Sequence, residues 1–103
     1  MIKITLPMKK IEDFCHRWKI FEFALFGSVL RDDFNANSDI DVMIQFDENS
    51  HYNLFDLVKM EDELKVIFNR DVDLVTRKGI ISSRNYLRRE NILNSAKTIY
   101  ESR

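Results

Sequence analysis

The chain has 103 residues, of which 45% are apolar and 32% charged, and this balance excludes both a disordered tail and a multidomain enzyme. The 16 basic and 17 acidic side chains give a net charge of -1, which excludes a polycation that coats nucleic acid or an anionic membrane. Charge is uneven along the chain, from +2 over residues 1–27 and -5 over residues 28–48 to -3 over residues 49–75 and +5 over residues 76–103. We therefore expect a single domain, residues 1–103, with an acidic middle and a basic C-terminal quarter.

Cysteine usage and the N-terminal sequence bear on location. The single cysteine, Cys15, cannot form an intramolecular disulfide, and the first ten residues lack the apolar stretch of a secretory signal. No run approaches the 18 apolar residues that a membrane-spanning helix needs. We expect a cytoplasmic protein that does not enter the membrane.

The first half of the chain predicts one helix and two strands. Apolar residues at three- and four-residue spacing predict an amphipathic helix over residues 8–18, opened by Pro7. A β-rich run over residues 20–26 predicts a buried strand that ends at Gly27. Alternation of apolar and polar side chains predicts a second strand over residues 39–46.

The second half predicts a helix, a strand and a less regular end. A polar loop over residues 47–53 is followed by an apolar periodicity that predicts a helix over about residues 53–68. The run DVDLVT predicts a third strand over residues 71–76, and the remainder is expected to be helical around residues 82–94, with a short strand or frayed turn near Thr98. The fold class expected is α+β (α/β by some schemes), with a small mixed sheet flanked by helices.

The strongest candidates for metal binding are two aspartates at alternate positions of the second predicted strand. Asp39 and Asp41 point to the same face, where two unpaired like charges would be costly. A hard divalent cation removes that cost, and Mg²⁺ binds one or two carboxylates together with water and substrate phosphates. Asp73 on the third strand offers a further carboxylate, and Asp71, which shares its face, is a competing candidate.

Strand direction decides whether these groups meet. Gly27 and Ser28 end the first strand while the aspartates begin the second, so they are close only if the two strands run antiparallel. The helix over residues 53–68 is the crossover that a parallel pairing of the second and third strands requires, and this pairing brings Asp73 to the same place. Gly27 permits a tight turn, and Ser28 at a helix N-terminus can hold anionic oxygens. A metal-binding carboxylate pair beside a phosphate-binding turn is what metal-assisted nucleotidyl transfer requires.

Together the motifs resemble a known family. Gly-Ser at residues 27–28, Arg31, Ser-Asp-Ile-Asp at residues 38–41 and Val-Asp-Leu-Val at residues 72–75 resemble the minimal nucleotidyltransferase (MNT) domains of the polymerase-β-like nucleotidyltransferase superfamily. The resemblance covers roughly residues 8–100 and implies the nucleotidyltransferase fold. One departure is Asp32, where many members have glycine.

The resemblance implies a role for each matched residue. Asp39 and Asp41 match the metal-binding pair, and Asp73 matches the third carboxylate, which deprotonates or positions the acceptor. These three are the implied catalytic and metal residues, with two Mg²⁺ ions and with ATP as substrate. The implied nucleotide-binding residues, on the same grounds, are Gly27, Ser28, Arg31 and Ser38, of which Arg31 matches an arginine in the helix after the turn.

Chains of this size resemble antitoxins paired with HEPN-domain toxins. The implied activity is transfer of AMP from ATP to a tyrosine hydroxyl of the HEPN ribonuclease toxin, which silences it, in a heteromeric complex and without direct nucleic-acid binding. Two alternatives stay open, an adenylyltransferase for a small-molecule acceptor and a non-catalytic module that neutralises its partner sterically. The basic segment of residues 77–91 would either dock an acidic surface of the partner or form a solvated helix face.

Overall fold

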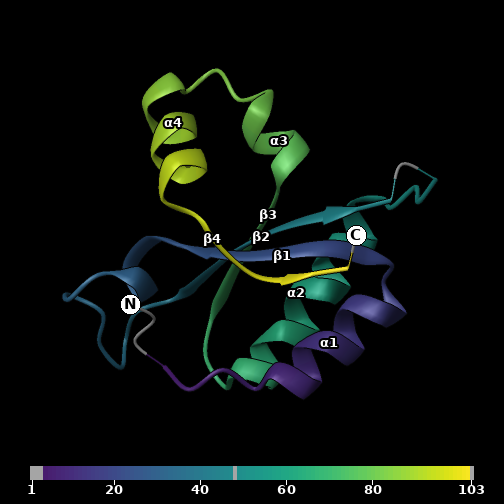
Figure 1. Ribbon diagram of the computed structural model, residues 1–103, viewed down its shortest axis with the longest axis horizontal. Coiled ribbons are helices and arrows are strands. Elements are labelled where there is room, and N and C mark those ends of the chain that lie inside the picture. Colours follow the sequence, from purple (N-terminus) through teal and green to yellow (C-terminus); the bar gives the residue numbers. More distant parts are fainter. Residues whose placement is uncertain (1–3, 48, 103) are drawn as a thin grey trace.

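The computed structural model describes residues 4–47 and 49–102, which form a four-stranded sheet with helices on both faces (Figure 1). In chain order the elements are α1 (Met8–Arg17), β1 (Ile20–Phe26), the 3-10 helix η1 (Gly27–Leu30), β2 (Ile40–Phe46), α2 (Leu54–Phe68), β3 (Val72–Thr76), α3 (Arg77–Ile81), α4 (Tyr86–Ser95) and β4 (Lys97–Glu101). The expected α+β class, with a small mixed sheet flanked by helices, is confirmed. None of the helices in these residues is long and apolar enough to cross a membrane.

The sheet has the strand order β3-β2-β1-β4. β1 and β2 are antiparallel, which places Phe26 at the end of β1 opposite Asp41 near the start of β2. α2 is the crossover that makes β2 and β3 parallel, and their register places Asp41 opposite Asp73. β4 returns antiparallel to β1. The predicted directions of the first three strands are therefore confirmed.

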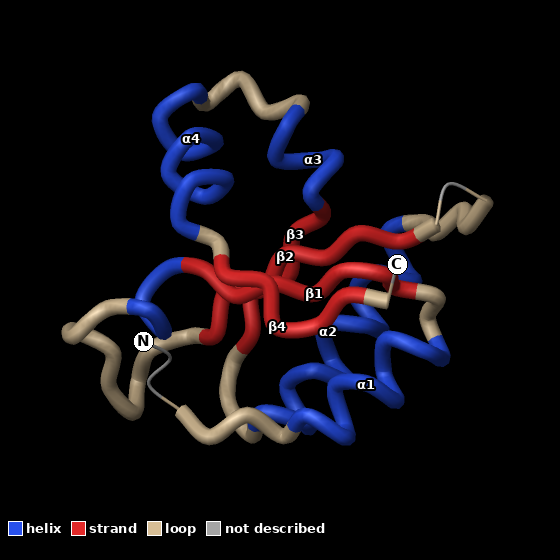
Figure 2. Tube along the Cα trace, in the orientation of Figure 1, coloured by secondary structure: helices blue, strands red, loops and turns tan. Residues whose placement is uncertain are grey.

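The larger core lies between the sheet and the helices α1 and α2, which Figures 1 and 2 show on the same side of the sheet. α1 contributes Phe14, whose ring meets that of Phe23 edge to face at a centroid distance of 6.3 Å. Cys15 is fully buried in this core. The inward side chains of β2 alternate along the strand, and the buried ones on this side are Ile40, Val42 and Ile44.

A smaller core lies on the opposite face of the sheet, under α3 and α4. Met43 of β2 is buried there with Phe26 of β1, Ile80 of α3 and Ile92 of α4. Because side chains alternate across a strand, Asp41 lies on the same face as Met43. The carboxylates of the sheet are therefore on the side that α3 and α4 cover.

In the C-terminal quarter, the helix expected around residues 82–94 is present as α4, which begins four residues later, and a further short helix, α3, was not expected. α3 begins directly after β3, where the Thr76 hydroxyl accepts a hydrogen bond from the Gly79 N–H at 3.0 Å. The side-chain oxygen of Asn85 caps the start of α4 in the same way, because it accepts a hydrogen bond from the Arg88 N–H at 3.1 Å. Each capping side chain accepts a backbone N–H from the first turn of its helix, so each cap marks the start of a separate short helix.

Candidate functional site

The turn after β1 is built against the first strand aspartate. Gly27 adopts φ +76°, a left-handed conformation that side chains rarely adopt. A Cβ on Gly27 would overlap with Asp41 Oδ2 and lie 3.1 Å from Asp41 Cγ. Glycine is thus required at this position both for backbone conformation and for space. The backbone of the turn and the Asp41 carboxylate are in contact.

Asp41 and Asp73 are register partners on adjacent parallel strands, whose axes lie about 4.8 Å apart in sheets of this kind. The pKa of the Asp41 carboxyl is raised above its ordinary value, first by burial and then by the negative charges of Asp73 and Asp39. The positive charges of Arg31 and Arg88 act in the opposite direction. Three carboxylates therefore lie close enough to disfavour ionisation of the one that is half-buried.

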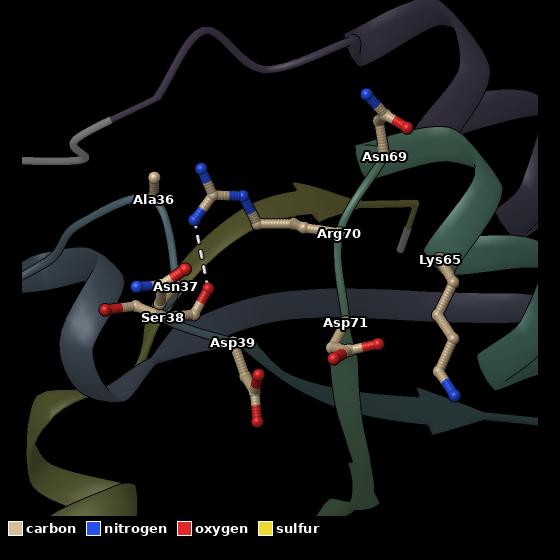
Figure 3. A pocket seen from close by; sticks show the side chains of 8 residues that line it. All are labelled: Ala36, Asn37, Ser38, Asp39, Lys65, Asn69, Arg70 and Asp71. Carbon is tan, nitrogen blue, oxygen red and sulfur yellow. Dashed lines mark hydrogen bonds between the residues drawn. The ribbon is translucent and has the colours of Figure 1, made fainter.

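Asp39 lies in the loop that leads into β2, and it is exposed. It lines a polar hollow of about 520 Å³ together with Asp71 and Lys65, as Figure 3 shows. The competing candidates for the third carboxylate are thus in different surroundings. Asp71 faces this hollow beside Asp39, whereas Asp73 is paired in register with Asp41.

A cleft of about 890 Å³ opens between the Gly27 turn and α4. Gly27, Arg31 and Asp41 line it from the sheet side, and Arg88 and Asn91 line it from α4. From the sequence, Arg88 is one of several basic residues in the segment of residues 77–91 and carries no specific sign that it belongs to the site. Its only signal was the positive charge of that segment, because nothing in the periodicity shows that α4 folds back over the sheet.

The remaining predicted nucleotide-binding residues lie around the same turn. Ser28 is in the first turn of a helix, as expected, but the helix is the four-residue 3-10 helix η1. The expectation that Arg31 lies within a helix is wrong. Arg31 follows η1, donates its backbone N–H to the Ser28 carbonyl at 2.9 Å and forms an ion pair with Asp33 at 3.2 Å. Ser38 closes the turn before β2, where its hydroxyl accepts the Asn35 N–H at 3.1 Å.

The donor set fits a magnesium ion in part. Within residues 4–47 and 49–102, no three His, Cys, Asp or Glu side chains are gathered as a ready-made metal site. Mg²⁺ does not require one, because it commonly uses one or two carboxylates and completes its shell with water and phosphate oxygens. Burial and then the negative charges of Asp73 and Asp39 raise the Asp41 pKa, and a cation bound there would relieve this repulsion. Asp41 with Asp39 or Asp73 can supply the oxygen ligands.

Comparison of the sequence with known proteins gives one family and several relatives. Residues 7–99 match the family model described as "Nucleotidyltransferase domain". The chain is 38% identical over 64 residues to "Putative protein adenylyltransferase MJ1379" of Methanocaldococcus jannaschii, a match that covers 62% of this chain but only 64% of that protein. It is 29% identical over 79 residues to "Protein adenylyltransferase MntA" of Thermococcus cleftensis, which covers 77% of this chain and 75% of the relative.

Comparison of the fold with solved structures gives the same architecture. A toxin–antitoxin complex with AMP-PNP matches with a TM-score of 0.72 and 22% identity, over 95% of this chain and 76% of that one. A structure described as a "putative minimal nucleotidyltransferase" matches with a TM-score of 0.65 and 27% identity, over 86% and 85%. A complex of the tri-AMPylated Shewanella oneidensis HEPN toxin with MNT antitoxin matches with a TM-score of 0.62 and 21% identity, over 91% and 69%. The fold is that of a minimal nucleotidyltransferase.

Proposed function

The chain belongs to the nucleotidyltransferase domain family, and on this premise we propose that it is a Mg²⁺-dependent protein adenylyltransferase that acts as an antitoxin. It transfers AMP from ATP to a tyrosine hydroxyl of a HEPN-domain toxin. Two kinds of similarity support the proposal. Relatives by sequence are named as protein adenylyltransferases, and relatives by fold include an antitoxin in complex with a tri-AMPylated HEPN toxin.

The observation that carries the proposal is the register of β2 and β3. It sets Asp41 beside Asp73 on the face of the sheet that α3 and α4 cover, and the Gly27 turn touches Asp41 at the same place. Carboxylates for a metal and a glycine turn for phosphates are the two requirements of phosphoryl-group chemistry. The cleft of about 890 Å³ beside them leaves room for a nucleotide.

The residues have separate roles in the transfer. Asp39, Asp41 and Asp73 would hold magnesium, which would neutralise the charge of the triphosphate and of the carboxylates. The free backbone N–H groups at the start of η1 bind phosphate oxygens. Arg31 and Arg88, on opposite sides of the cleft, supply positive charge to the remaining phosphate oxygens.

The bond changes follow from these positions. The tyrosine oxygen forms a bond to the α-phosphorus of ATP, the bond from that phosphorus to the bridging oxygen breaks, and pyrophosphate leaves. Asp73, which is exposed, accepts the proton of the tyrosine hydroxyl. The product is AMP joined to the tyrosine by a phosphodiester bond.

The acceptor protein would reach the site across α3 and α4. The described residues of these helices and their connection expose Ile81, Tyr86 and Leu87, which are 51%, 60% and 75% accessible. Lys78 and Arg84 are exposed on the same segment. Exposed apolar side chains on a segment that also carries basic residues would fit an acidic protein surface with an apolar anchor.

The test is label transfer from ATP that carries a labelled α-phosphate, in the presence of Mg²⁺ and the HEPN-domain product of an adjacent gene. We expect the label on a tyrosine of that protein, and loss of the label in the variant Asp41→Asn. The matched control is Asp13→Asn, which removes an exposed carboxylate from α1 on the opposite face of the sheet. Transfer that survives in Asp41→Asn would exclude this site. Neutralisation of the toxin without any transferred AMP would favour the steric alternative, and labelling of a small hydroxyl compound without a partner protein would favour the small-molecule alternative.

A further inference from the structure

The side chain of Arg70 holds the loop that precedes β2. Its Nη1 donates hydrogen bonds to the backbone carbonyls of Asn35, at 3.1 Å, and Ser38, at 3.0 Å, and Figure 3 shows the second of these. The guanidinium carbon lies 4.6 Å from the centroid of the Phe34 ring. One half-buried arginine thus contacts three residues of the segment between η1 and β2.

The crossover helix places Arg70 there. Asn69 caps the C-terminus of α2 in the left-handed conformation (φ 54°, ψ 42°) and turns the chain toward β3. Two residues after Asn69, the backbone carbonyl of Asp71 accepts a hydrogen bond from the Ile40 N–H at 2.9 Å. Ser38 and Ile40, the two neighbours of Asp39 in sequence, are therefore both bonded to the segment of residues 70–71.

Asp39 lies between these two attachments in the sequence. Its side chain is exposed, and in the described part of the chain it makes no hydrogen bond or ion pair. The turn before it is closed internally by the Ser38 N–H, donated to the Asn35 carbonyl at 3.0 Å, and by the Ser38 hydroxyl. These bonds shape the turn but do not attach it to the sheet. Arg70 and the Asp71 carbonyl make the attachment.

We propose that Arg70 is a positioning residue, which holds the backbone just before Asp39 so that this carboxylate stays beside Asp41 for the metal-bound nucleotide. The proposal rests on the proposed function. Arginine suits the task because its planar guanidinium can stack on Phe34 while one nitrogen reaches two carbonyl oxygens. A residue that orients a ligating group commonly changes metal affinity by about 10- to 100-fold when it is replaced.

The first measurement is calorimetric affinity for AMP-PNP with Mg²⁺, in the whole chain, for Arg70→Met and for a matched control. The control is Arg17→Met, because Arg17 also donates two hydrogen bonds from a single Nη1, to the Glu63 carboxylate at 3.1 and 3.2 Å, but on the α1 side of the molecule. We expect Arg70→Met to weaken the affinity by about tenfold, with Arg17→Met within about twofold of the original chain. Arg70→Lys, which keeps the charge but loses the planar group, should fall between them. Unchanged affinity in both Arg70 variants would overturn the proposal.

The second measurement separates this proposal from the proposed function. Amide hydrogen exchange in nucleotide-free protein reports the Ser38 and Ile40 N–H groups directly. In Arg70→Met both should exchange about tenfold faster or more, while the Leu25 amide in β1 keeps its protection. If the original chain does not bind AMP-PNP with Mg²⁺, the proposed function is wrong, and the exchange result still decides the role of Arg70. If Arg70→Met does not fold, Arg70→Lys carries both measurements. Equal exchange in every Arg70 variant would overturn the proposal.

Discussion

The backbone of Gly27 lies against the carboxylate of Asp41, so closely that a Cβ at position 27 would overlap with Oδ2. The contact joins the end of β1 to the start of β2, two strand ends that the antiparallel register brings together. It makes the phosphate-binding turn and the metal-binding carboxylate of the proposed site a single structural unit. A change in either residue should therefore affect the other.

Gly27→Ala should destabilise the fold and prevent nucleotide binding. The left-handed backbone at this position costs a residue with a Cβ about 1–3 kcal/mol, and the overlap with Asp41 adds to that cost. Chemical denaturation measures the stability, and calorimetry with AMP-PNP and Mg²⁺ measures the binding.

The control is Gly79→Ala in α3, where a Cβ would lie 3.0 Å from the Thr76 hydroxyl and where alanine favours the helix. Its stability should stay within about 1 kcal/mol of the original chain. An equal loss of stability in both variants would show that the Gly27 turn has no special requirement.

Asp41→Asn should raise the thermal midpoint at neutral pH although it abolishes activity. The pKa of Asp41 is raised in the folded chain, first by burial and then by Asp73 and Asp39, so the folded state binds a proton more tightly than the unfolded state. Stability then falls as pH rises from the ordinary value of 3.8 through the raised folded pKa, and it stays lower above that pH. Asparagine removes this loss because it carries no charge.

Thermal unfolding at several pH values between 3 and 8 measures the effect. The gain from Asp41→Asn should be largest at neutral pH and should shrink as pH falls below the folded pKa. Asp13→Asn, at an exposed position on α1, serves as the comparison and should show no such pattern. A lower midpoint for Asp41→Asn at pH 7 would show that its carboxylate is stabilised, not strained, in the folded protein.

Cys15 should resist thiol reagents in the native state. Burial, with a smaller contribution from the negative charge of Glu12, raises its pKa to about 12, and the side chain is fully buried in the core. The reactive thiolate is therefore absent at pH 8 and the sulfur is inaccessible. Labelling with a chromogenic disulfide should be negligible in the folded protein and complete after denaturation. Fast labelling without denaturant would contradict the packing of α1.

Charge reversal on the α3–α4 segment should weaken the complex with the partner protein. The double variant Lys78→Glu with Arg84→Glu replaces two exposed positive charges, and we expect at least tenfold weaker binding at low salt. The comparison is Lys9→Glu with Lys10→Glu on α1, which makes the same charge change on the other face. Binding to the HEPN-domain protein is measured at two salt concentrations. Equal weakening by both pairs would show only a long-range charge effect.

Much of the site could be predicted from local sequence patterns. The bounds of β1 and the alternation along β2 follow from periodicity, and the parallel pairing of β3 follows from a helix of the right length between two strands. These relations place Asp41 beside Asp73 without knowledge of any distant contact. The resemblance to minimal nucleotidyltransferases rests on the same residues, and the family match and the fold confirm it.

The residues that were missed depend on packing between distant segments. Arg88 enters the cleft because Ile92, one turn further along α4, packs with Met43 and Phe26 on the sheet, and nothing in the local sequence shows that contact. Arg70 meets Ser38 only because the crossover ends beside the start of β2. The helix α3 was also not predicted, because a helix of five residues is too short to show a helical periodicity.

The most direct test of the central claim compares two aspartates at alternate positions, in the same label-transfer reaction with the HEPN-domain protein. Asp73 is the register partner of Asp41, while Asp71 faces the neighbouring hollow. Asp73→Asn should lower the transfer rate by about 100-fold or more, the contribution expected of a general base, with Asp71→Asn within a few-fold of the original rate. Full activity in Asp73→Asn, or a larger loss in Asp71→Asn, would contradict the assignment of the reaction to the Asp41–Asp73 pair.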